Sequence, residues 1–321
     1  MSVAAEPKQR FAYDADEVEL QAIRGGVASV AGGAHDELIS GEADEIGTTT
    51  AGAVPRWQEM ESAISEIAGG ALEVAGLRKG ILGELYPFAI DGGGLVHSEA
   101  SNLFYDYCLL TSVAASRPDR RHQSLVRHFE RVVRDLLVAF VGGDAVGVRI
   151  GWPSEKDWDQ LPKRMRRKVE WMKSLCGYDV DEWTFDTAKR LDAVRERAKD
   201  ARIDVVVHRT HGDGRIGGIT LLGQCGCGRG DVDSSSRKHE ELSTAWLSHF
   251  FGRNSIPSGL RAFATSQHIV RSDDLYAKQS VADVMILDRI RLCILANDHP
   301  VVVDAHRDRI VQMMSDVLGP A

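Results

Sequence analysis

The stretch ARIDVVVHRTHGDGRIGGITLLGQCGCGRG, residues 201–230, contains two apolar runs separated by a turn rich in glycine and aspartate. The runs at about 203–209 and 217–224 have the length and composition of β-strands. Asp204 opens the first run and Gln224 closes the second. A hairpin brings the start of one strand beside the end of the next. The stretch therefore predicts a β-hairpin that places Asp204 next to Gln224.

The segments around this hairpin alternate between helical and strand patterns. HQSLVRHFERVVRDLLVAFVGG (122–143) predicts an amphipathic helix that ends at two glycines, and AVGVRIGWP (145–153) predicts a short strand. RAFATSQHIV (261–270) predicts a strand, whereas SVADVMILDRIRLCILAND (280–298) and HRDRIVQMMSDVLG (306–319) predict helices. Helices ordered around a small sheet indicate an α/β fold. Three regions follow: an acidic arm rich in Gly and Ala at 1–55, a helical region at 56–116 and an α/β core at 117–321. The helical region either packs on the core or forms a small N-terminal domain.

Residues 1–55 hold most of the net charge of −8, because ten acids there face only three bases. Few large apolar groups occur within this segment, so we expect a flexible or loosely packed arm. The alternative is a segment that docks onto a partner or onto the protein's own basic face. The rest of the chain is nearly neutral, which leaves room for clustered bases that contact a polyanion.

Metal-dependent phosphodiester cleavage needs oxygen ligands for Mg²⁺ at the edge of a sheet, together with a cation that assists the attacking water or the phosphate. Asp204 and Gln224 on paired strands, with Glu130 on the preceding helix, supply such oxygens. The pieces DARID (200–204), GQC (223–225) and FE (129–130) resemble the PD-(D/E)XK nuclease superfamily, in the branch where Gln replaces the second acid. Within this superfamily, the chain looks like a group of bacterial proteins with this core that serve restriction or phage defence.

This resemblance implies a restriction-endonuclease-like core, a central mixed sheet flanked by helices. It also implies a Mg²⁺- or Mn²⁺-dependent endonuclease in which Glu130, Asp204 and Gln224 hold the metal. The substrate would be DNA rather than RNA. Partners would be other proteins of a defence system, and a homo-oligomer is left open.

One part of the family pattern is missing from this chain. The lysine of the Q-x-K motif falls on position 226, which is Gly226. Lys238 on the next predicted helix is the nearest lysine that could replace it, and Arg229 and Arg237 are other candidates. If no cation reaches the site, the chain is a catalytically degenerate subunit that binds nucleic acid or scaffolds a defence complex.

A zinc site is the alternative use of this region. It would take Cys225 and Cys227 with His208, His211 or His239. Structural zinc sites usually have two pairs of ligands at short spacing, and C-x-C has no second pair here. Small buried cysteines beside glycines are the simpler interpretation.

Basic runs supply candidate contacts with phosphates, which give most non-specific affinity for nucleic acid. The first run spans 117–134, and the second contains Arg164, Arg166, Arg167 and Lys168. Five scattered cysteines do not form a disulfide framework and are typical of the reducing cytoplasm. The chain has no apolar run of membrane-spanning length and no secretory signal at its start, so we expect no membrane contact.

Overall fold

The computed structural model describes residues 8–30, 53–98, 102–117, 119–151, 203–213, 218–233, 260–282 and 284–319. Its larger sheet has the strand order β4-β5-β6-β7-β8. Neighbours are antiparallel from β4 to β6 and parallel from β6 to β8. The strands are β4 (Val146–Arg149), β5 (Val205–Arg209), β6 (Ile219–Cys225), β7 (Leu260–Ala264) and β8 (Met285–Leu287). The expected α/β class with a central mixed sheet is therefore confirmed.

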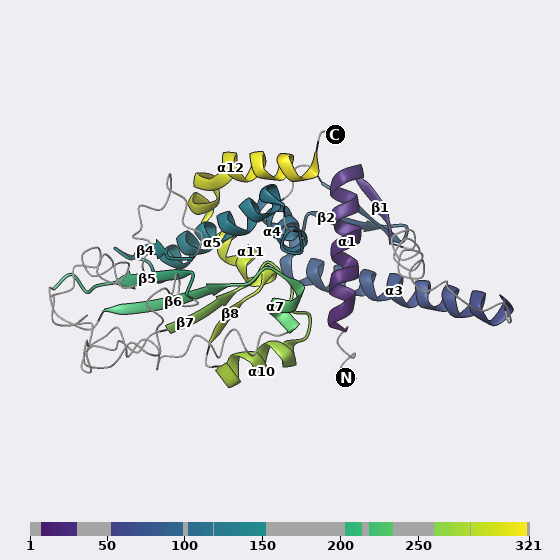
Figure 1. The fold of residues 1–321 in the computed structure, drawn as a ribbon, viewed down its shortest axis with the longest axis horizontal. Coiled ribbons are helices and arrows are strands. Elements are labelled where there is room, and N and C mark those ends of the chain that lie inside the picture. Colours follow the sequence, from purple (N-terminus) through teal and green to yellow (C-terminus); the bar gives the residue numbers. More distant parts are fainter. Residues whose placement is uncertain are drawn as a thin grey trace.

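Helix α5 (Arg120–Val141) covers one face of this sheet, as Figure 1 shows. It begins at the side chain of Asp119, which accepts hydrogen bonds from two backbone N–H groups, and ends at Gly142, whose φ is 72°. Its apolar stripe is fully buried against the strands and three further helices. These helices are α4 (Leu103–Ala114), α11 (Arg289–Asp298) and α12 (Pro300–Leu318). The opposite face packs against α7 (Arg229–Asp233) and α10 (Ser272–Ala282).

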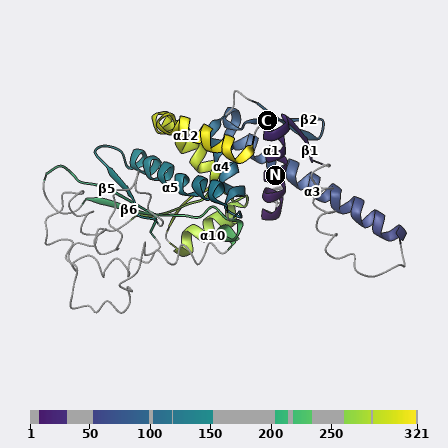
Figure 2. The same ribbon diagram turned by 45° about the horizontal axis from the view of Figure 1, so that its top comes forward.

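The N-terminal part builds a second, smaller sheet of order β1-β3-β2. Its strands are β1 (Val27–Ser29), β2 (Phe88–Asp91) and β3 (Gly94–His97), and the turn between β2 and β3 has two glycines with positive φ. Two helices pack beside it, α1 (Gln9–Gly25) and α3 (Ala53–Leu82), which is followed by the short 3₁₀ helix η1 (Gly83–Leu85). Figure 2 shows the long α3 extending away from the rest of the molecule.

The expectation of a loosely packed arm is wrong for residues 8–30. Helix α1 buries Phe11, Ala15 and Leu20 in the core, and even its acids Asp16 and Glu19 are at most 3% exposed. The physical reason is that both acids pair with buried arginines from distant parts of the chain. Residues 31–52, the remainder of the acidic segment, lie outside the described residues.

Most predicted core elements that fall on described residues are confirmed, and the helices expected at about 155–175, 184–199 and 237–252 lie outside the described residues. The hairpin, the helix at 122–143, the strand at 145–153 and the last helix appear as β5–β6, α5, β4 and α12. The segment 280–298, expected as one helix, instead contains strand β8 followed by α11. The hairpin β2–β3 within the region 56–116 had no counterpart in the prediction.

A single hydrophobic core joins the N-terminal elements to the larger sheet. Residues of α1, α3 and α4 belong to the same buried cluster as residues of α5, β5, β6 and α12. The boundary expected at 116–117 therefore does not separate two cores. Among the helices that the structure describes, none combines the length and apolarity needed to cross a bilayer.

Candidate functional site

Asp204 lies immediately before β5, at a local irregularity of the sheet. Its carbonyl accepts hydrogen bonds from two consecutive N–H groups of the neighbouring strand, Ile150 at 2.7 Å and Gly151 at 3.2 Å. Two residues of one strand that face a single residue of its neighbour form the pattern of a β-bulge, which changes the direction of the side chains there. The Asp204 carboxylate is held by the backbone N–H of Cys225, which donates to Oδ2 at 2.8 Å. Asp204 is thus fixed at the end of the hairpin by both strands beside it.

Glu130 and Asp204 converge on one small space next to Gly151. A Cβ added to Gly151 would lie 2.6 Å from Glu130 Oε2 and 3.0 Å from Asp204 Oδ1. A side chain at position 151 would therefore displace the Glu130 carboxylate and crowd that of Asp204. Helix α5 supplies Glu130 from one side, and the bulge between β4 and β5 supplies the glycine and Asp204 from the other. The structure brings these two predicted residues together.

The two carboxylates disturb each other electrostatically. Burial, and then the charge of Asp204, raise the pKa of Glu130 to about 8. Arg149 on β4 opposes this increase, because its Nε donates to Glu130 Oε2 at 2.6 Å. The Arg149 side chain is 0% exposed and that of Glu130 is 12% exposed. Near neutral pH the pair therefore holds a proton that a cation could displace.

Gln224 lies in the strand beside Asp204, but its side chain does not point toward α5. Its partner on β7 is Phe263, which packs with Val232 and Ile286 on the opposite face of the sheet. Side chains alternate along a strand, so Gln224 shares the face of Phe263. Its Oε1 is buried and has no hydrogen-bond partner among the described residues. The structure gives Gln224 an unsatisfied oxygen without directing it at Glu130.

Alternation along β6 places the cysteines, instead of the glutamine, on the side of Glu130. Burial, then Asp204 and Glu130, raise the pKa of the Cys225 thiol well above its usual range. The Cys227 thiol is also buried with a raised pKa. Without a metal ion both thiols are held in the protonated form, so zinc would have to displace their protons to bind.

Of the histidines of the zinc alternative, the structure describes His208 and His211. His208 Nδ1 contacts Thr220 Oγ1 at 3.0 Å, His211 follows the end of β5, and His239 lies outside the described residues. Among the described residues, no three His, Cys, Asp or Glu side chains form a metal-binding group.

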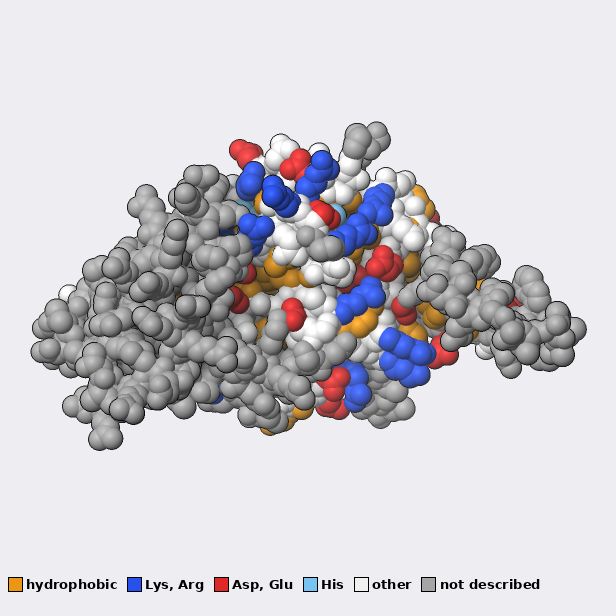
Figure 3. Space-filling view, viewed as in Figure 1, with side chains coloured by type: hydrophobic (Ala, Val, Ile, Leu, Met, Phe, Trp, Pro, Cys, Tyr) orange, Lys and Arg blue, Asp and Glu red, His pale blue; other side chains and the backbone are white. Residues whose placement is uncertain are grey.

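The remaining predicted site residues are not placed. Lys238 and the basic run Arg164, Arg166, Arg167 and Lys168 lie outside the described residues. Part of the first basic run is not available to a polyanion, because Arg131 is buried and Arg134 bonds to Asp135. On the face of the molecule drawn in Figure 3, the Lys and Arg side chains of the described residues lie mixed with Asp and Glu.

Sequence reasoning missed three residues at this site: Arg149, Gly151 and Cys225 as a neighbour of the carboxylates. For Arg149 and Gly151 the only signal was the letters RIG (149–151) within the predicted strand 145–153. Their meaning depends on the approach of α5 to the end of β4, which is a contact between separate segments.

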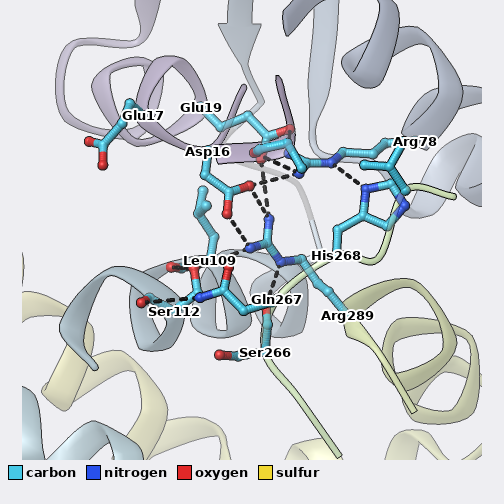
Figure 4. Close-up of polar contacts among 12 residues, drawn as sticks. Asp16, Glu17, Glu19, Arg78, Leu109, Ser112, Ser266, Gln267, His268 and Arg289 are labelled. Carbon is cyan, nitrogen blue, oxygen red and sulfur yellow. Dashed lines mark hydrogen bonds and ion pairs between the residues drawn. The ribbon is translucent and has the colours of Figure 1, made fainter. Parts of the chain in front are cut away.

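A second charged cluster, drawn in Figure 4, lies among α1, α3 and α11. Arg289 forms two hydrogen bonds of 2.7 Å with Asp16, and Arg78 contacts Glu19 at 2.7 Å. Burial alone would raise the pKa of Asp16, but Arg289 and Arg78 hold it below its usual range. All four side chains are buried and paired, so the cluster joins α1 to the core and is a structural feature.

Comparisons of the chain with protein-family models, with curated proteins and with solved structures found no match.

Proposed function

We propose that the protein is a Mg²⁺- or Mn²⁺-dependent endonuclease that hydrolyses phosphodiester bonds of DNA. The observation that carries this proposal is the convergence of Glu130 and Asp204 on one glycine, Gly151, where an added Cβ would approach an oxygen of each carboxylate. The buried pair holds a proton near neutral pH even with Arg149 in contact, and a cation that displaced this proton would stabilise both carboxylates in their charged form. Carboxylate oxygens are the ligands that Mg²⁺ and Mn²⁺ prefer.

Glu130 and Asp204 would hold the ion. When bound, such an ion supplies Lewis-acid polarisation of a phosphate and a water of lowered pKa. The hydrogen bond from Cys225 N keeps Asp204 facing the gap, and the bulge keeps the backbone of Gly151 close. Both carboxylates approach the same glycine, so an ion that entered beside Gly151 would meet an oxygen of each.

The order of the elements supports the resemblance to the restriction-endonuclease-like core. A helix with Glu130 precedes three antiparallel strands, and Asp204 opens the second of them. A mixed sheet with helices on both faces is what that resemblance implies. On this basis we extend the proposal to a cytoplasmic role in defence against foreign DNA, with other proteins of a defence system as partners.

Plasmid nicking tests the proposal directly. Supercoiled DNA is incubated with the purified chain and Mg²⁺ or Mn²⁺, and Asp204→Ala is compared with Asp144→Ala, an exposed aspartate in the turn after α5. We expect nicking by the wild type and by Asp144→Ala, and none by Asp204→Ala. Equal nicking by Asp204→Ala would contradict the site assignment.

The second candidate function is a nuclease-fold subunit that binds nucleic acid without cutting it. The observation in its favour is Gly226, which stands where the family pattern has a lysine. Such a subunit would bind DNA in a salt-dependent manner, and neither metal would produce nicks. Nicking that disappears in Asp204→Ala would exclude this function.

A further inference from the structure

We propose that Arg149 is the positioning cation of the Glu130–Asp204 site, where it fixes the orientation of the Glu130 carboxylate. This inference rests on the proposed function. It concerns how the carboxylate pair is held ready for a metal ion, and it assigns a residue that the family pattern does not supply.

Position 226 cannot carry the lysine in this fold. A Cβ on Gly226 would lie 2.8 Å from the ring of Phe263 and 3.0 Å from the Cβ of Asp231. Real Cβ atoms do not approach ring carbons so closely, and the site belongs to a tightly packed interior. The same direction leads toward the face of Phe263, away from α5. A lysine there would neither fit nor face Glu130.

Arg149 reaches the carboxylates from the neighbouring strand instead. In the pairing of β4 with β5, Arg149 is the partner of Val205, which packs in the core beneath α5. Partners across a strand pair share one face, so the guanidinium projects toward the helix that carries Glu130. The result is the contact of 2.6 Å between Nε and Glu130 Oε2.

The complete burial of Arg149 decides what kind of role it has. A side chain with 0% exposure does not touch a DNA phosphate in this arrangement, so its effect passes through Glu130. Arginine is suited to this task, because it is charged at all relevant pH values and its planar group fixes a carboxylate in orientation. Oε2 is both the atom that Arg149 holds and the atom that borders the gap at Gly151. Moving the guanidinium therefore moves a metal ligand.

A double-mutant cycle tests this role without relying on cleavage. The affinity for Mn²⁺ is measured by calorimetry for the wild-type chain, Arg149→Met, Glu130→Gln and the double variant, with circular dichroism to confirm folding. Contacting residues that act together are typically coupled by about 2- to 150-fold. We expect Arg149→Met to change the affinity by such a factor when Glu130 is present, and by less than about twofold in the Glu130→Gln chain. Arg149→Lys, which retains the charge, should recover part of the lost coupling and serves as the test variant if Arg149→Met does not fold.

Equal effects of Arg149→Met in both backgrounds, or no effect in either, would overturn the role of Arg149. Asp204→Asn separates this outcome from a failure of the proposed function. If Asp204→Asn abolishes Mn²⁺ binding but the cycle shows no coupling, only the role of Arg149 is lost. If Asp204→Asn binds Mn²⁺ as the wild type does, or the wild type binds none, both proposals fall. In cleavage assays, Arg149→Met should lower kcat with little effect on KM, as expected when a positioning residue is removed.

Discussion

Replacing Glu130 with glutamine should remove a pH dependence of stability that the buried carboxylate pair causes. The pKa of Glu130 is raised from 4.5 to about 8 in the folded protein, so the folded state holds the proton more tightly than the unfolded state. A group of this kind contributes stability at pH values below 4.5, and that contribution is lost as the pH rises toward 8. Each pH unit within this window is worth about 1.4 kcal/mol.

The full window sets a ceiling of about 5 kcal/mol on the free energy of unfolding. We expect roughly 2–3 kcal/mol between pH 5 and pH 8, because Asp204 shares the proton and the site is not completely dry. Urea denaturation at pH 5, 6, 7 and 8 measures the effect. Absolute stability also changes when Arg149 loses its carboxylate, so the slope against pH is the informative quantity.

The control for this experiment is Glu73→Gln, because Glu73 is an exposed glutamate on α3. The wild type and Glu73→Gln should change stability with pH in parallel, whereas Glu130→Gln should gain roughly 2–3 kcal/mol on both of them between pH 5 and pH 8. Parallel slopes for all three proteins would refute the electrostatic reasoning. They would mean that Glu130 ionises in the folded state as it does in the unfolded chain.

Three further outcomes follow from the same structure. Gly151→Ala places a Cβ 2.6 Å from Glu130 Oε2 and should abolish the thermal stabilisation by Mn²⁺. The control Gly76→Ala should keep this stabilisation, because position 76 has open space around it. An unchanged response to Mn²⁺ in Gly151→Ala would contradict a metal site beside Gly151. Arg289→Met leaves Asp16 buried without its bidentate partner and should destabilise the protein by about 3–5 kcal/mol in urea denaturation, and a loss under about 1 kcal/mol would argue against the cluster as a junction. Burial, then His306, lower the pKa of His128 to about 3. The contribution of His128 to stability should therefore fall by about 2 kcal/mol as the pH drops from 6.5 to 5, and His128→Gln should lack this contribution. An equal pH dependence in both proteins would count against a neutral buried histidine.

The sequence was sufficient for the elements whose pattern is local. The amphipathic stripe of α5, with Phe129 on its buried side, and the two runs of the hairpin needed only periodicity and turn residues. The pairing of Asp204 with the end of β6 followed from these elements. Glu130 came near Asp204 because α5 covers the face on which the hairpin is packed.

The rest depended on contacts that one sequence does not display. The run that became β8 is short and apolar throughout, and such a run is consistent with either a buried strand or a helix. The acids of α1 look solvent-exposed in the sequence, since their partner Arg289 lies 273 residues away from Asp16. The direction of Gln224 depends on which face of β6 meets α5, and this choice is fixed by the register with Phe263.

Anomalous diffraction from crystals soaked in Mn²⁺ would test the central claim most directly. The account predicts one Mn²⁺ peak in the gap beside Gly151, at about 2.1 Å from an oxygen of Glu130 and of Asp204. Asp204→Asn crystals treated in the same way should lack that peak. A wild-type protein that nicks DNA while its Mn²⁺ peak lies elsewhere, or a gap that stays empty at saturating Mn²⁺, would contradict the account.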